Sequence, residues 1–250
     1  MTSMTEQRRH GTEPETQNAT PRLTLTSDAA VADLEQFATR ARRVSDTGMR
    51  LQLIPPAAEG REAVLAQWVN VMSPRGLGDD VPTVLGLRTV PVASAEHAED
   101  LDATVPLAAV LERTARMKDS GPAGGVDRTF NVPPSRENRP WTALTPPRAG
   151  WTQVAEVGHE DLIMVAKDGI TAIRQALPSN PGDAVVQRLR AAVWGQMLGE
   201  PAVVPSGCAF AAFSLGFLPP QGRARVLQHG SWTRIDTTGG FVLHRPAVSL

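Results

Sequence analysis

The sequence predicts an α+β fold built from two units, and three observations support this. Between residues 22 and 118, a helical pattern precedes short β-branched runs with short connections, which favours a mainly antiparallel sheet with flanking helices. Three helix-like segments then lie between Asp161 and Phe217. A glycine-interrupted run from Ala224 to Arg245 follows and predicts β-hairpins. We therefore expect a C-terminal unit of three helices plus a β-hairpin, which resembles a winged helix.

The N-terminal α+β domain is expected to span residues 22–118, after a tail at residues 1–21 that is polar and typical of disorder. Ser27 or Asp28 can cap its first helix, and Gly48 lies just past the end. Residues 63–68 also fit a helix, so their strand assignment has an alternative. The expected elements are a short strand at Arg22–Thr26, the capped helix, strands at Met49–Ile54, Val64–Met72, Thr83–Val92 and Leu101–Val105, and a helix from Pro106 to Met117.

Residues 119–157 read as a Pro/Gly-rich connecting segment. Six prolines and four glycines fall between residues 119 and 150, which excludes a continuous helix or a central strand there. Trp141 and Trp151 flank the run TALTPPRAG, and a tryptophan in a free linker would expose a large apolar surface. We therefore expect this segment to pack onto one of the flanking units.

The C-terminal unit is expected at residues 158–250. An apolar stripe from Leu162 ends at Pro178, and Asn180 with Pro181 begins the second helix. The third helix, from Ser206 to Gly216, is almost wholly apolar, which is typical of a helix buried on all sides. Glycine-dependent turns separate the strands that follow, at Arg223–His229, Trp232–Thr237 and Phe241–Arg245.

Composition narrows the class of protein. A net charge of −1 provides no overall field that would attract nucleic acid or an anionic membrane. The single cysteine, Cys208, excludes an intramolecular disulfide and a multi-cysteine zinc site. No apolar run approaches the roughly 20 residues that cross a bilayer, and the N-terminus has no apolar signal-peptide core. We expect a cytoplasmic protein with no membrane partner.

No constellation of residues names a catalytic chemistry, and we predict no catalytic residue, no cofactor and no metal site. Cys208 lies near a helix N-terminus but among small apolar neighbours, which favours packing over nucleophilic attack. His97 has acidic neighbours, as in a solvated loop, and His229 and His244 lie on neighbouring strands without a third ligand. The alternative is an enzyme whose site is assembled from scattered residues, with Cys208, Asp79, Asp80 and the histidines as candidates.

A nucleic-acid-binding regulator is the first alternative function. The hairpin region is mildly basic, and it would contact phosphates while the third helix read base edges. That helix offers only Ser214 as a polar reader, which disfavours this function. The basic residues are Arg223, Arg225, Arg234 and Arg245, against Asp236 alone.

Three runs of sequence resemble uncharacterised proteins of high-GC actinobacteria: TVLGLRTVPVASAEHAEDLDATVPLAAVLERTARM, PWTALTPPRAGW and SWTRIDTTGGFVLHR. The resemblance covers most of residues 22–245. It implies a soluble bacterial cytoplasmic protein and carries no activity, cofactor or site residue.

The leading functional hypothesis is a non-catalytic protein-binding or adaptor protein. Tryptophan and arginine are over-represented at interface hot spots, and here they gather in the connecting segment and the hairpin. The alternative is that these tryptophans only hold the fold together. The candidate interaction residues are Trp141, Arg148, Trp151, Trp232 and Arg234.

Overall fold

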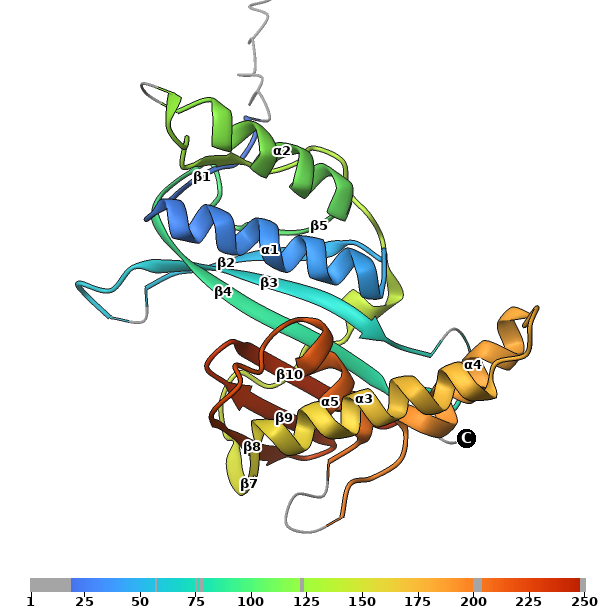
Figure 1. Cartoon of the computed structure of the whole chain (residues 1–250). Coiled ribbons are helices and arrows are strands. Elements are labelled where there is room, and N and C mark those ends of the chain that lie inside the picture. The colour runs from blue at the N-terminus through green and yellow to red at the C-terminus, as the bar shows by residue number, and fades with distance from the viewer. Residues whose placement is uncertain are drawn as a thin grey trace, which may run out of the picture.

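The fold is a ten-stranded sheet with helices packed on one face (Figure 1). The computed structural model describes residues 19–56, 58–74, 76, 79–121, 124–199 and 204–247. Most of the expected tail, residues 1–18, lies outside this part of the chain, as do residues 77–78 of the loop before Asp79. The main path of the sheet runs in the order β5-β2-β3-β4-β10-β9-β8-β7, and β1 and β6 branch from β4.

The chain begins with one strand, one helix and then four strands, and it ends with one strand, three helices and then three strands. The strands are β1 (Arg22–Leu25), β2 (Met49–Ile54), β3 (Ala63–Met72), β4 (Thr83–Glu96), β5 (Asp102–Val105), β6 (Thr129–Asn131), β7 (Thr152–Gly158), β8 (Arg223–His229), β9 (Trp232–Thr237) and β10 (Gly240–Arg245). The helices are α1 (Asp28–Val44), α2 (Leu107–Asp119), α3 (His159–Ala176), α4 (Asp183–Trp194) and α5 (Ser206–Ser214), with a 3-10 turn η2 (Pro140–Ala143).

The N-terminal elements form as the sequence predicts. Ser27 caps α1, because its hydroxyl accepts a hydrogen bond from the Ala30 amide at 3.2 Å. Helices α1 and α2 lie side by side over the strands of this half (Figure 1). Residues 63–68 belong to strand β3, which pairs antiparallel with β2 and β4, so the helical alternative is wrong. The sheet in this half is antiparallel throughout.

The long strand β4 joins the two halves of the chain. One edge of β4 pairs with β3 along most of its length. The opposite edge pairs first with β10, from Thr83 to Leu87, and then with β1, from Val92 to Glu96. Because the C-terminal strands are hydrogen-bonded directly to an N-terminal strand, the two halves share one sheet.

The winged-helix prediction is wrong. Strands β8, β9 and β10 are not a wing beside a helical reading head, because they continue the central sheet and β7 extends it further. Helices α3 and α5 pack together on the face of these strands that carries the other helices. Strand β6 and all of β7 except Gly158 lie within residues 119–157, where the sequence pattern indicated only a connecting segment. Proline and glycine around these short strands mask their alternation.

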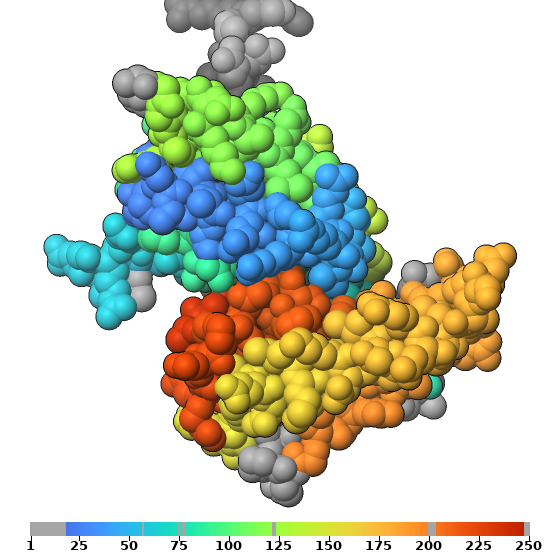
Figure 2. All heavy atoms as spheres, viewed as in Figure 1, coloured from blue at the N-terminus to red at the C-terminus, as the bar shows by residue number. Residues whose placement is uncertain are grey.

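Helix α5 is interior, as its composition predicts. Cys208, Ala209, Ala211 and Ala212 have no exposed surface, and Leu215 is 1% exposed. Phe210 is half-buried and stacks on Trp194 at 4.5 Å between ring centroids. Helix α4 and the second half of α3 project beyond the sheet as an arm (Figure 2).

One hydrophobic core spans both halves. Phe37 on α1 and Phe217, just after α5, stack with their ring centroids 5.7 Å apart. Arg40 on α1 donates hydrogen bonds to the carbonyls of Leu215 and Gly216, each at 3.3 Å. Arg88 on β4 pairs with Asp33 on α1 and also donates to the Gly239 carbonyl. The Arg40 bonds satisfy two carbonyls at the end of α5, and the Arg88 bond ties the turn between β9 and β10 to the N-terminal half.

A buried histidine makes the stability of the fold sensitive to acid. His244 on β10 is 6% exposed, and burial lowers the pKa of its imidazole to about 4. In the unfolded chain this group takes up a proton near its ordinary pKa of about 6.5. The unfolded state therefore binds more protons between these two values, and the free energy of unfolding falls as the pH falls through this window. We expect His244 to account for a loss of about 3 kcal/mol between pH 7 and pH 4.

Urea unfolding at pH 7, 5.5 and 4.5 measures this effect, with His244→Gln as the comparison. The variant has no imidazole to protonate, so its stability should decline less steeply over the same pH range. Identical pH profiles for the two proteins would show that His244 does not carry the acid sensitivity.

Candidate functional site on the sheet face opposite the helices

The face of the sheet opposite the helices is crossed by the connecting segment. We call residues 140–151 of this segment the strap. Trp141 donates its indole N–H to the Thr47 carbonyl at 3.2 Å, and the Thr142 carbonyl accepts a bond from Arg50 at 2.9 Å. Near the other end of the strap, Trp151 donates to the Pro147 carbonyl at 2.9 Å. The segment therefore packs down onto the sheet, as its tryptophans predict.

A second, smaller hydrophobic core lies between the strap and this face. Its buried members come from β4, the strap, β9 and β10: Leu85, Trp141, Trp232 and Leu243. Partly buried apolar side chains surround them: Trp68, Leu87, Leu144, Trp151 and Phe241. The face thus has a closed centre and a half-open apolar rim.

Trp151, Arg234 and Phe241 form the part of the rim that we call the Trp151 patch. The Arg234 guanidinium carbon lies 4.9 Å from the centre of the Trp151 ring and 5.6 Å from that of Phe241. Asp236 holds this guanidinium through two hydrogen bonds of 2.6 and 2.7 Å. This bidentate pair fixes the Arg234 guanidinium beside the two rings, so the patch is pre-organised.

The structure separates the five predicted interaction residues into two groups. Trp141 and Trp232 are 5% and 8% exposed, and both lie in the second core. Trp151 and Arg234 are half-buried neighbours in the Trp151 patch, and Arg148 is exposed on the strap. The pKa of the nearby Asp102 carboxyl is lowered, mainly by its hydrogen bonds to Arg50 and to a smaller extent by the positive charge of Arg148.

Phe241 belongs to the patch but was not among the predicted residues. The signal that identifies it is strand alternation combined with pairing: Phe241 and Leu243 share a face of β10, and Leu243 lies opposite Arg234 on β9. The sequence shows this alternation, but it does not show which face of the sheet the strap leaves half-open.

The four arginines expected to contact nucleic acid all have partners within the molecule. Arg223 pairs with Glu156 at 3.1 Å. Arg225 and Arg234 share Asp236, at 3.4 and 2.6 Å. The Arg245 guanidinium lies 5.9 Å from the centre of the Trp232 ring.

Three of the candidate catalytic residues have surroundings typical of packing or of a turn. Cys208 is fully buried, and burial raises the pKa of its thiol far above its usual range, which disfavours the nucleophilic thiolate. His159 is buried and its Nδ1 lies 3.0 Å from the Pro219 carbonyl, on a different element from Cys208. The Asp79 carboxylate accepts a hydrogen bond from the Val81 amide at 3.1 Å, as in a turn.

In the acidic loop around His97, one carboxylate already has internal partners. Asp102 is engaged by Arg50 and Gln52, at 2.6 and 2.8 Å. Within the described ranges, no three histidine, cysteine, aspartate or glutamate side chains are placed to hold one metal ion. In the same part of the chain, no helix combines the length and the apolar character needed to cross a membrane.

Two sequence families match the chain, one in each half. Residues 18–134 match a domain of unknown function, DUF8010, and residues 146–249 match a second, DUF8185. Both are described as domains of unknown function, so neither match assigns an activity. No curated protein sequence matches it.

Solved structures identify the fold. A putative DNA polymerase III beta subunit from Eubacterium rectale superposes with a TM-score of 0.52 at 10% identity, over 92% of this chain and 65% of that one. Caulobacter crescentus pol III beta and a DnaN sliding clamp from Pseudomonas aeruginosa give TM-scores of 0.47, at 14% and 13% identity. They are covered over 66% of their lengths, and this chain over 92% and 93%. The Eubacterium rectale structure therefore shows that this chain has the fold of a DNA polymerase III beta subunit, and the chain spans 65% of that protein.

Proposed function

We propose that this protein is a non-catalytic scaffold that binds another protein through the Trp151 patch and the neighbouring strap. The observation that supports this most directly is the Arg234 guanidinium held between Trp151 and Phe241 on a half-open sheet face. Tryptophan and arginine are the side chains most enriched among interface hot spots. A fork already fixed by Asp236 loses little side-chain entropy when a partner binds.

The likeness to clamp structures supports a scaffold rather than an enzyme. The Eubacterium rectale protein is named as a putative subunit of a DNA polymerase, and a subunit works through contacts with other proteins. Because Trp141 and Trp232 are buried, we assign them to packing and keep Trp151, Arg234 and Arg148 as contact residues.

DNA binding is the second function that the clamp likeness raises, and the charge pattern disfavours it. Helices α1, α2, α3 and α4 together carry ten basic and nine acidic side chains, and α5 carries none. Binding to the phosphate backbone needs a clear excess of basic groups, with affinity that falls steeply with salt. The arginines of the C-terminal strands already have internal partners.

Affinity purification from the native host at endogenous expression levels tests the proposal. The bait variant combines Trp151→Ala with Arg148→Ala, which removes contact groups and leaves the Arg234–Asp236 pair in place. The matched control is Met164→Ala, because Met164 is 57% exposed on α3 and lies away from the strap.

We expect wild type and the Met164 variant to retain the same partner, and the strap variant to lose it. All three proteins should remain folded at the temperature of the purification, as thermal unfolding can verify. An unchanged set of bound proteins for the strap variant would refute the proposed surface. A steeply salt-dependent shift of duplex DNA by the wild type would favour the second function instead.

A further inference from the structure

Strand β6 leaves an open backbone edge at the end of its branch of the sheet. It pairs with β1 on one side only. The Leu25 amide donates to the Arg128 carbonyl and the Val132 amide to the Pro21 carbonyl, both at 2.9 Å. In an antiparallel pair this pattern directs the Phe130 backbone groups toward β1 and those of Thr129 and Asn131 away from it.

Three of the outward-facing groups have no partner in the described part of the chain: the Asn131 N–H, the Asn131 carbonyl and the Thr129 carbonyl. The Thr129 N–H is different, because it donates to the Asp127 carboxylate at 2.8 Å. Unpaired groups along a strand edge are a template for another strand.

The other ends of the sheet are less suited to accept a strand. The outer edge of β5 is covered in part, because the Thr104 carbonyl accepts a bond from the Glu137 amide at 2.8 Å. Strand β7 has a register irregularity between Gln153 and Ala155, and a bulge of this kind blunts an edge.

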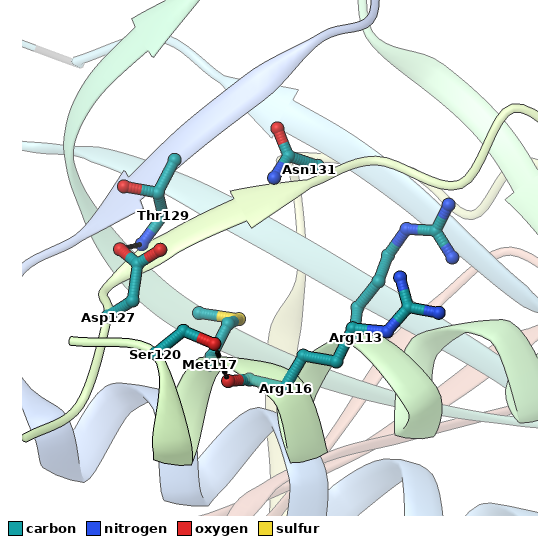
Figure 3. Close-up of a pocket in the computed structure, with 7 residues that line it drawn as sticks. All are labelled: Arg113, Arg116, Met117, Ser120, Asp127, Thr129 and Asn131. Atoms are coloured by element: carbon teal, nitrogen blue, oxygen red, sulfur yellow. Dashed lines mark hydrogen bonds between the residues drawn. The ribbon is translucent and has the colours of Figure 1, made fainter. Parts of the chain in front are cut away.

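A groove lies directly beside the β6 edge. A cavity of about 280 Å³ separates the strand from α2, and Met117 contributes an apolar side chain to it. Figure 3 shows the Arg113 and Arg116 guanidinium groups toward the Asn131 end of the groove and the Asp127 carboxylate at the Thr129 end. Arg116 also pairs with Glu112 on its own helix, and Arg113 with the Ala109 carbonyl at 3.3 Å.

We propose that this groove binds an extended acidic peptide segment of a partner protein, which adds a strand to β6. The added strand would lie about 4.8 Å from β6 and bond to the three open backbone groups. An antiparallel segment places its first residues at the Asn131 end, where two guanidinium groups complement carboxylate side chains. This surface is separate from the Trp151 patch, so the two proposals succeed or fail independently.

The test uses the full chain and a blocked, fluorescently labelled peptide, Glu-Glu-Val-Thr-Val-Thr, with fluorescence anisotropy as the readout. Asn131→Pro removes the outward N–H, and an edge strand tolerates proline. Asn131→Ala is the matched control, because it removes the side chain and keeps the N–H. A second variant, Arg113→Gln with Arg116→Gln, removes the positive end of the groove.

We expect the wild type and Asn131→Ala to bind the peptide with similar Kd values. Asn131→Pro should raise Kd about fivefold and the double arginine variant about tenfold or more, from the lost hydrogen bonds. A peptide with lysines in place of the two glutamates should bind at least about tenfold more weakly.

Several outcomes overturn the proposal. They are no binding by the wild type, equal Kd values for Asn131→Pro and Asn131→Ala, or equal affinity for the lysine peptide. Sedimentation of the wild type and of Asn131→Pro tests whether a second copy of the chain occupies the edge. If the wild type is a dimer and Asn131→Pro is a monomer, the edge joins two copies and the peptide proposal is wrong. The Kd of Asn131→Pro is used only if this variant has the same thermal unfolding as the wild type. If it does not, the Kd of the double arginine variant tests the proposal instead.

Discussion

Replacing Phe217 with alanine is expected to destabilise the whole molecule by about 3–5 kcal/mol, the usual cost of truncating a buried aromatic side chain. Phe217 has no exposed surface and stacks on Phe37 of α1. The substitution opens a cavity where the two halves meet, so one unfolding transition should move to lower denaturant concentration without splitting. Urea unfolding followed by circular dichroism and by tryptophan fluorescence measures this.

Phe213→Ala is the matched control, because Phe213 lies one helical turn earlier and is only half-buried. Its cost should be clearly smaller, since part of the ring already contacts water. Equal costs for the two variants, or two separate transitions in the Phe217 variant, would contradict a core shared by both halves.

Replacing Trp141 with alanine should cost about 3–5 kcal/mol and loosen the strap. The indole is buried in the second core and bonded to the Thr47 carbonyl, so its loss leaves a cavity and an unpaired acceptor. Trypsin should then cleave more rapidly after Arg148, which lies on the strap.

Trp151→Ala offers the comparison, because this tryptophan is half-buried at the rim. We expect it to cost no more than about 2 kcal/mol. If Trp141→Ala were no more destabilising than Trp151→Ala and cleavage after Arg148 were unchanged, the strap would not be held by its buried tryptophan.

Local patterns predicted much of the secondary structure. Helix α1 with its Ser27 cap, strand β3 and the buried α5 all follow from periodicity and apolar content. What was missed is the assembly: the pairing of β4 with β10 joins residues about 150 positions apart, and no local signal records such a contact. A hairpin next to three helices therefore indicated a winged helix, although the same strands complete a larger sheet.

The candidate site was predicted in part for a similar reason. Tryptophan and arginine were recognisable as interface-forming types, but sequence does not show which tryptophan the strap buries. Trp141 and Trp151 look equivalent in the run PWTALTPPRAGW, yet one bonds to Thr47 beneath the strap and the other holds Arg234 at the rim. The open edge of β6 was invisible, because three residues flanked by turn-forming sequence carry no strand pattern.

Native-state hydrogen exchange in low denaturant tests the central claim most directly, namely that one sheet and one core join both halves. The amides of β3 in the N-terminal half and β9 in the C-terminal half should exchange with the same free energy of opening, equal to that of global unfolding. Opening of β9 at a free energy lower than that of β3 by more than about 2 kcal/mol would show that the halves unfold separately.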